Sequence, residues 1–281
     1  MTTGSRPLPL GWKPTSLMLR ILSAFVLLTI VIGAILLGQY GAYALVLLLG
    51  GLALWEFIGL SDGMGSRAPA WLLFPLGIFF AFSGTVLKPI DVNLVLALSL
   101  VGGLAAFLVV QGRRQGLGRW AMGMAGALYI GMPFNYYLLL YTSQPHGRIW
   151  ALFVIFAVVA NDAAALLVGS RIGRHPFFPA ISPRKTVEGA IAGVLGSVLV
   201  MLVGVSAILG LPPLHAIALG ILVGVSGQVG DLVESQMKRI AEVKDSSHLI
   251  PGHGGVLDRL DSILFPPILV YFYVVMFQIL K

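Results

Sequence analysis

Residues 149–169, IWALFVIFAVVANDAAALLVG, form an apolar run of 21 residues that contains a single carboxylate, Asp162. Roughly 20 apolar helical residues cross a hydrocarbon core about 30 Å thick, so this run predicts a membrane-spanning helix. Eight further runs have the same character, at residues 17–37, 40–60, 71–87, 92–110, 120–141, 187–211, 213–232 and 262–280. The sequence therefore predicts an all-α integral membrane protein, a polytopic bundle of about nine transmembrane helices.

The overall composition supports this class. The chain has 281 residues, of which 58% are hydrophobic and 10% are charged, and its mean hydropathy is +0.95; soluble domains differ in all three respects. The run at 17–37 is longer than a signal-peptide core and has no clear small-residue cleavage site, so we interpret it as a retained first helix. The absence of cysteine excludes disulfides and thiolate metal sites.

The basic residues predict the topology. With a cytoplasmic N-terminus, nine spans place 15 of the 18 basic residues on the inner side and leave only Lys88, Arg148 and Lys281 outside. Short loops with this bias follow the positive-inside rule. The same bias accounts for the net charge of +7 without a nucleic-acid partner.

The acidic residues predict where the site lies. Eight of the eleven occur from Asp162 onward: Asp162, Glu188, Asp231, Glu234, Glu242, Asp245, Asp258 and Asp261. A charged side chain within a span costs about 2.5 to 3.5 kcal/mol and normally faces a polar cavity. We therefore expect residues 1–150 to be a transmembrane scaffold of about five helices. Residues 151–281 are predicted to be a catalytic region of about four helices with its cavity open to the cytoplasm.

Three acidic positions allow either a structural or a functional interpretation. Glu56, near the inner end of the second predicted span, is interpreted as a helix-end or interhelical polar contact. Glu188 follows a loop and either caps its helix or binds substrate, because carboxylates are favoured in a first helical turn. For Asp162 a functional role is favoured, because its own span offers no basic partner and small residues surround it.

Asp258 and Asp261 are three residues apart, so in a helix they share one face with Cβ atoms about 5 to 6 Å apart. Carboxylates at this spacing suit a hard cation, with magnesium favoured. Cationic residues near this pair and glycines that flank His253 suit phosphate binding. Motifs for a P-loop and for serine or zinc hydrolysis are absent. The residues alone predict metal-assisted phosphoryl or nucleotidyl transfer to a membrane-embedded substrate.

Residues 235–262, SQMKRIAEVKDSSHLIPGHGGVLDRLDS, resemble the signature of CDP-diacylglycerol synthases, or phosphatidate cytidylyltransferases. The family pattern is S-x-x-K-R, four residues, K-D, and then P-G-H-G-G-x-x-D-R-x-D, and every position is matched. Residues 161–189, NDAAALLVGSRIGRHPFFPAISPRKTVEG, resemble the aspartate span and the S-P-K-K-T-x-E-G loop of the family. Arg174 and Arg184 replace lysines that are common there, and Leu166 replaces a tyrosine. Arginine keeps the charge but changes the donor geometry, so Lys185 has the firmer role.

The resemblance implies that CTP and phosphatidic acid react to CDP-diacylglycerol and pyrophosphate in the bacterial cytoplasmic (inner) membrane. It also implies magnesium dependence, a two-cation site whose second ion is Mg²⁺ or K⁺, and a homodimer. The predicted metal ligands are Asp231, Asp258 and Asp261; the other predicted catalytic residues are Asp162, Lys185, Lys238, Arg239, Lys244, Asp245, His253 and Arg259. Substrate binding is predicted for Ser182, Arg184, Lys185, Thr186, Glu188, Ser235, Gly252, Gly254 and Gly255.

Two other functions, a lipid kinase and a transporter or channel, share parts of this pattern. A CTP-dependent kinase of a polyprenol or similar lipid alcohol shares the membrane setting, CTP and magnesium, but transfers the γ-phosphoryl group instead. A transporter or channel is disfavoured, because such folds often carry repeats with interrupted helices in both halves. The first half of this chain shows neither a clear repeat nor matching acidic spans.

Overall fold

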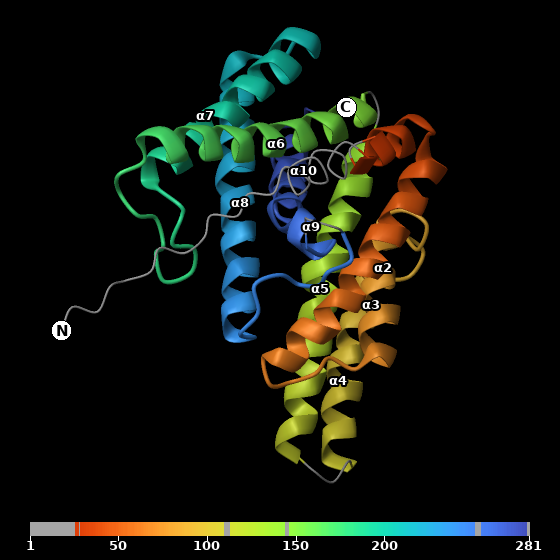
Figure 1. Cartoon of the computed structure of the whole chain (residues 1–281). Coiled ribbons are helices and arrows are strands. Elements are labelled where there is room, and N and C mark those ends of the chain that lie inside the picture. Colours follow the sequence, from red (N-terminus) through yellow and green to blue (C-terminus); the bar gives the residue numbers. More distant parts are fainter. Residues whose placement is uncertain (1–25, 28, 110–112, 144–145, 251–253, 280–281) are drawn as a thin grey trace, which may run out of the picture.

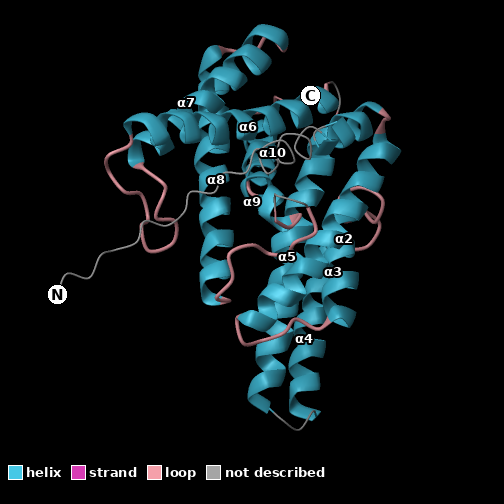
Figure 2. Ribbon diagram, in the orientation of Figure 1, coloured by secondary structure: helices cyan, strands magenta, loops and turns pink. Residues whose placement is uncertain are grey.

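The structure is a computed structural model that describes residues 26–27, 29–109, 113–143, 146–250 and 254–279. These residues form helices joined by loops, as Figure 2 shows, and within them the only β-type pairings are two isolated bridges. The elements are α2 (Gln39–Gly63), α3 (Ala70–Phe82), α4 (Val92–Val109), α5 (Arg113–Thr142), α6 (Gly147–Ile172), α7 (Val187–Met201), the π-helix η1 (Leu202–Ile208), α8 (Pro213–Ile240), α9 (Leu257–Leu264) and α10 (Pro266–Met276).

The helices correspond to the predicted spans, although not all of them are long enough to cross a bilayer. Residues 17–25 and 28 of the first predicted span, 17–37, lie outside the described residues. In the described part of the chain, five helical stretches are long and apolar enough to cross a membrane: Gln39–Gly63, Gly147–Ile172, Val187–Ile208, Pro213–Ile240 and Leu257–Met276. By contrast α3 has 13 residues, about 20 Å of helix. The helical membrane class is confirmed, whereas the count of nine spans stays a prediction.

The last predicted span, 262–280, differs most from the structure. Helix starts five residues earlier, at Leu257, and divides into α9 and α10 at Phe265. The division follows from Pro266 and Pro267, because proline lacks a backbone N–H and disfavours helical geometry in the residue before it. Asp258 and Asp261 consequently lie inside a helix. Because both residues are helical and three positions apart, their side chains share one face of the helix, as predicted.

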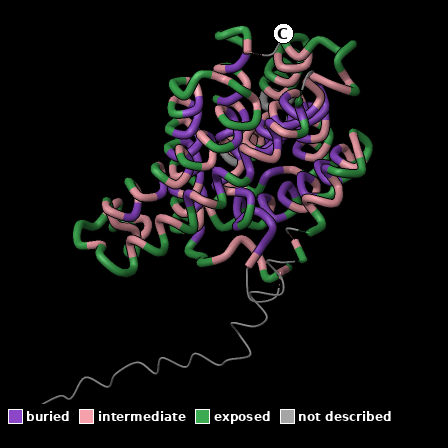
Figure 3. Tube along the Cα trace, turned by 90° about the horizontal axis from the view of Figure 1, so that it is seen from above, coloured by how far each residue is buried: buried purple, intermediate pink, exposed green. Residues whose placement is uncertain are grey.

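Two buried clusters hold the helices together. One is built mainly by α2, α3 and α5 and includes Phe57, Leu73 and Ile130. The other is built by α6, α7, α8 and α10 and includes Trp150 and Val223. In Figure 1, α9 and α10 lie between α5 and α8, and Figure 3 shows the buried residues gathered inside the bundle. The short helix α9 packs into the first cluster, so it joins the early helices to α8. The proposed division at residue 150 stays a prediction.

Glycines let α8 approach its neighbours closely. A Cβ atom added at Gly220 would lie 2.4 Å from the Val198 Cα atom of α7. A Cβ atom added at Gly230 would lie 2.3 Å from the carbonyl oxygen of Asp261 on α9. Small residues at membrane-helix interfaces allow such backbone approach. Because Gly230 has no side chain, the backbone of α9 packs directly against α8.

Loops that carry basic residues meet at one end of the bundle. The Arg119 Nε atom donates to the Arg67 carbonyl oxygen at 3.4 Å, and Gly63 packs against Ala241. At the opposite end the Tyr141 hydroxyl donates to the Ile35 carbonyl oxygen at 2.8 Å. One side of the bundle therefore holds the ends of α2 and α8 and the start of α5. This arrangement agrees with the predicted topology.

We expect Gly230→Ala to lower the thermal midpoint of unfolding, because the added methyl group overlaps the α9 backbone. Overpacking of this kind costs about 1–3 kcal/mol. Circular dichroism of the purified protein in detergent measures the midpoint. The matched control is Gly51→Ala, since a Cβ atom at Gly51 meets nothing within 4 Å and alanine favours a helix interior. Equal midpoints for both variants would contradict the close contact between α8 and α9.

Candidate active site

The signature segment begins on α8 and ends on α9, and a buried carboxylate from α2 fixes the start of α9. Glu56 is 2% exposed. It accepts hydrogen bonds from the backbone N–H groups of Val256 at 2.8 Å and Leu257 at 2.6 Å. It also accepts from the hydroxyls of Ser246 at 3.1 Å and Ser247 at 2.6 Å. A carboxylate at a helix N-terminus satisfies otherwise unpaired N–H groups. The interpretation of Glu56 as an interhelical polar contact is confirmed.

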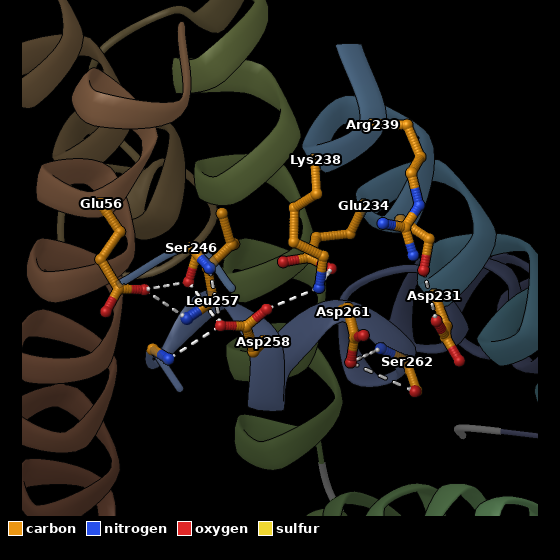
Figure 4. A network of polar contacts seen from close by, with 12 residues as sticks. Glu56, Asp231, Glu234, Lys238, Arg239, Ser246, Leu257, Asp258, Asp261 and Ser262 are labelled. Carbon is orange, nitrogen blue, oxygen red and sulfur yellow. Dashed lines mark hydrogen bonds and ion pairs between the residues drawn. The ribbon is translucent and has the colours of Figure 1, made fainter. Parts of the chain in front are cut away.

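Asp258 accepts four hydrogen bonds from its surroundings, as Figure 4 shows in part. One oxygen accepts from the Lys238 ammonium at 2.6 Å. The other accepts from the Ser246 N–H at 2.8 Å, the Ser246 hydroxyl at 2.9 Å and the Gly255 N–H at 2.8 Å. These bonds close the loop between α8 and α9 on itself. In this arrangement Asp258 organises the loop, and both of its oxygens are occupied by donors.

The glycines of the signature have a packing role. Gly254 has a backbone φ of +85°, a region that glycine adopts without strain. A Cβ atom at Gly255 would lie 2.1 Å from the Ser246 hydroxyl and 2.6 Å from the Glu56 carboxylate. The absent side chain thus makes room for these two groups. The predicted site residues Gly252 and His253 lie outside the described residues.

Lys238 stands between two buried carboxylates. Besides Asp258 it forms an ion pair with Glu234, one turn earlier on α8, and the Glu234 side chain is fully buried. Sequence reasoning counted Glu234 among the acidic residues but did not include it in the site. The signal was its spacing of four residues from Lys238, which places the two side chains together on a helix. Removing one partner of a buried pair leaves an uncompensated charge, so the pair constrains this part of α8.

A second charged group joins α6, α8, α9 and the loop before α7. The Lys185 ammonium lies 2.7 Å from an Asp231 oxygen, and the Ser235 hydroxyl donates to the other oxygen at 3.1 Å. Asp162 and Asp231 both lie within electrostatic range of Asp261. Asp261 itself accepts from the Ser262 N–H at 2.7 Å. Asp162 and Asp231 are therefore near enough to Asp261 for their charges to act on it, and Lys185 is the counter-ion of Asp231.

The loop between α6 and α7 is held by residues predicted to bind substrate. Glu188 accepts from the Arg174 and His175 N–H groups at 3.1 and 3.3 Å. Thr186 is the N-cap of α7 and accepts from the Gly189 N–H at 3.2 Å. Glu188 therefore fixes the preceding loop, and Thr186 is the N-cap of the helix. A role of Glu188 in binding substrate stays a prediction.

The remaining predicted residues lie around this loop and the next. The Arg239 Nε atom donates to the Ile181 carbonyl oxygen at 3.1 Å, which ties α8 to the loop before α7. Ser182 accepts from the Lys185 N–H at 3.2 Å within a turn. Asp245 packs beside Gly254. Four of the predicted cations are exposed: Arg184, Arg239, Lys244 and Arg259.

The described residues contain no group of three histidine or acidic side chains already placed to hold a metal ion. The predicted ligands are divided between two environments, because Asp258 faces Lys238 and Ser246 whereas Asp231 pairs with Lys185. The magnesium site stays a prediction.

Comparison with known proteins gives the family. The pattern of the Cytidylyltransferase family matches residues 18–277. This chain belongs to the cytidylyltransferase family. A phosphatidate cytidylyltransferase of Bacillus subtilis is 39% identical over 153 residues, 54% of this chain and 57% of that protein. A phosphatidate cytidylyltransferase of Staphylococcus saprophyticus is 34% identical over 238 residues, 78% of this chain and 89% of that protein. The predicted family is confirmed, and with it a nucleotidyltransferase.

We expect Glu56→Gln in this cytidylyltransferase to lower both the thermal midpoint and the turnover number. The glutamine amide would turn an NH₂ group toward N–H and O–H donors, and a buried donor left without a partner costs about 1–3 kcal/mol. The midpoint is measured by circular dichroism and turnover by release of pyrophosphate from CTP.

The control for this variant is Glu242→Gln, which removes an exposed carboxylate of the same loop. It should change neither quantity. A Glu56→Gln protein with the midpoint and turnover of the parent would show that this carboxylate does not hold the loop.

Proposed function

We propose that this cytidylyltransferase transfers the cytidylyl group of CTP to phosphatidic acid, which yields CDP-diacylglycerol and pyrophosphate. The observation that carries the proposal is the contact network of the described signature residues, in which buried carboxylates of α2, α8 and α9 surround Lys238 and the loop after α8. Such an arrangement suits phosphate chemistry in a helical membrane protein, whose lipid substrate is present in the bilayer. Its relatives named phosphatidate cytidylyltransferase add support.

The reaction joins two anions, so charge and alignment set its rate. The phosphatidate oxygen that attacks is already anionic and requires no strong general base. The protein has to offset repulsion and align the attack on the α-phosphorus. Lys185 is half-buried beside Asp231 and is available to exchange that carboxylate for a phosphate. Lys238, Arg239, Lys244 and Arg259 are the other cations that we assign to the substrate phosphates.

We propose the carboxylates around Asp261 as ligands of a divalent cation. Asp162, Asp231 and Asp261 outnumber the two ammonium groups near them, Lys185 paired with Asp231 and Lys238 within electrostatic range of Asp261, and oxygen ligands are those that Mg²⁺ prefers. We therefore assign Mg²⁺ to Asp231 and Asp261, because Asp231 would release only Lys185 and Ser235, whereas Asp258 would have to release Lys238 together with the donors of its own loop. When bound, the ion supplies positive charge to phosphate oxygens. A second ion, Mg²⁺ or K⁺, stays part of the proposal.

The proposed location is the bacterial cytoplasmic membrane, with the N-terminus and the site facing the cytoplasm. The shared end of the basic loops supports this orientation. A homodimer, implied by the resemblance, stays a prediction for the single chain. Transfer of a γ-phosphoryl group to a lipid alcohol is not favoured, because the family and its named relatives are cytidylyltransferases.

The product of the reaction tests the function. We expect purified protein with phosphatidate, Mg²⁺ and α-labelled CTP to give a labelled lipid, whereas γ-labelled CTP gives labelled pyrophosphate and unlabelled lipid. Thin-layer chromatography separates the products. In membrane vesicles, CTP should react only from the cytoplasmic face, since it does not cross the bilayer. Label from the γ position in the lipid would instead identify a kinase.

The assignment of the metal predicts different results for the three aspartates. Asp231→Asn and Asp261→Asn should each reduce turnover at least about a hundredfold, in the range seen when one charge-stabilising group is removed. The thermal midpoint of Asp231→Asn should change little, because the Asp231–Lys185 pair is partly exposed. Asp258→Asn should lower turnover and midpoint together. Lys88→Gln, at an exposed position, is the control. Near-normal magnesium-dependent turnover in Asp231→Asn and Asp261→Asn would contradict the assignment.

A further inference from the structure

A cavity of about 290 Å³ lies beside α9. Helices α2, α5, α6, α9 and α10 supply its walls, together with Leu27 and Val31 from the segment before α2. Among the described residues, its lining side chains are aliphatic or aromatic except for Arg259, and Tyr137 adds a hydroxyl group. Its volume is close to the lower limit of the roughly 300–1,000 Å³ usual for small-molecule pockets.

The two faces of α9 serve different environments. The Asp258 carboxylate accepts a hydrogen bond from Lys238 of α8. Asp261 lies within electrostatic range of Asp162 on α6 and Asp231 on α8. Arg259, Leu260 and Ile263 line the cavity instead. This division follows the helical period, because residues four apart lie on one side. The short helix α9 therefore separates the polar site from the apolar cavity. Arg259 lies on the side of the cavity, next to Asp258 in the sequence.

The position of the cavity matches the depth of a lipid chain. Glu56, which caps α9, is seven residues from the end of α2 at Gly63, about 10 Å along the helix. Leu49, in the cavity wall, is fourteen residues from that end, about 21 Å. Gly63 lies at the end where basic loops gather. The cavity thus extends from the first turn of α9 toward the middle of the proposed membrane.

We infer that this cavity holds one acyl chain of the phosphatidate substrate and that Arg259 pairs with the lipid phosphate. The inference rests on the proposed function and deepens it. The charges are complementary, because a guanidinium binds phosphate through paired N–H donors. Apart from the Tyr137 hydroxyl, the other described lining residues offer CTP no polar side chain, whereas an acyl chain meets a wall as apolar as the lipid around it. Binding here places the lipid phosphate beside the network of Asp258 and Lys238.

Filling the cavity should weaken the use of long-chain lipid selectively. We expect Val159→Trp, and separately Val31→Trp, to raise the KM for dipalmitoyl phosphatidate at least about tenfold, or about 1.4 kcal/mol. The KM for CTP and the rates with dihexanoyl phosphatidate should stay unchanged. Val203→Trp is the control: Val203 is 54% exposed, comparable with Val159 at 47%, but belongs to η1 and does not line the cavity. Unchanged KM values for long-chain lipid in both cavity variants would overturn the inference.

A binding measurement separates this inference from the proposed function. Phosphatidate with a diazirine on one acyl chain is irradiated with the full chain in the absence of CTP, and labelled peptides are mapped by mass spectrometry. We expect label on α6 and α9 residues of the cavity, stronger than with the matching diacylglycerol, and loss of that preference in Arg259→Gln.

The outcomes distinguish the two claims. Formation of CDP-diacylglycerol without label in the cavity would overturn the inference and leave the function standing, whether another part of the chain or a second copy fills the space. Label in the cavity without formation of CDP-diacylglycerol would contradict the function and leave the binding site standing. Equal labelling by phosphatidate and diacylglycerol would overturn the role of Arg259.

Discussion

The contact between the Glu56 carboxylate and the first turn of α9 is the interaction on which the site depends. Glu56 is deep in α2, and its four donors all belong to the segment between α8 and α9. Hydrogen bonds to a charged group are each worth about 1.5–3 kcal/mol, and a buried carboxylate without them would be costly. Because this contact sets where α9 begins, it also sets which way Asp258, Arg259 and Asp261 face. The early helices thus contribute directly to the geometry of the site.

Charge balance is the second constraint. Lys238 pairs with Glu234 and Asp258 together, and Lys185 pairs with Asp231. Asp231 and Asp258 also accept hydrogen bonds from other donors, whereas Lys238 is the ion-pair partner of Glu234 among the described residues. Around α8 and α9 the acidic groups that can carry negative charge outnumber these two ammonium groups. Substrate phosphates would add more of that charge. This explains why a divalent cation belongs in the proposal even though the described side chains do not already enclose one.

Close helix packing makes both constraints possible. The glycines of α8 bring its backbone against α7 and α9, which places polar side chains from different helices within bonding distance. The same packing leaves an apolar cavity on the far side of α9. A helix eight residues long can therefore serve the polar reaction site on one face and a lipid chain on the other, because successive side chains turn about its axis.

The sequence by itself determined the helical membrane class, the family and the segment that carries the chemistry. These depend on local properties: the length of apolar runs such as 149–169 and the fixed spacing of residues 235–261. It also allowed Asp258 and Asp261 to share a helix face, because that follows from a spacing of three residues. Only the tertiary structure decided that Asp258 is bound by Ser246 and Lys238, and that Asp261 joins Asp162 and Asp231. It also decided that Glu56, 200 residues before Val256, caps α9. Spacing along one helix cannot reveal such partners, because they are chosen by the packing of helices far apart in the chain.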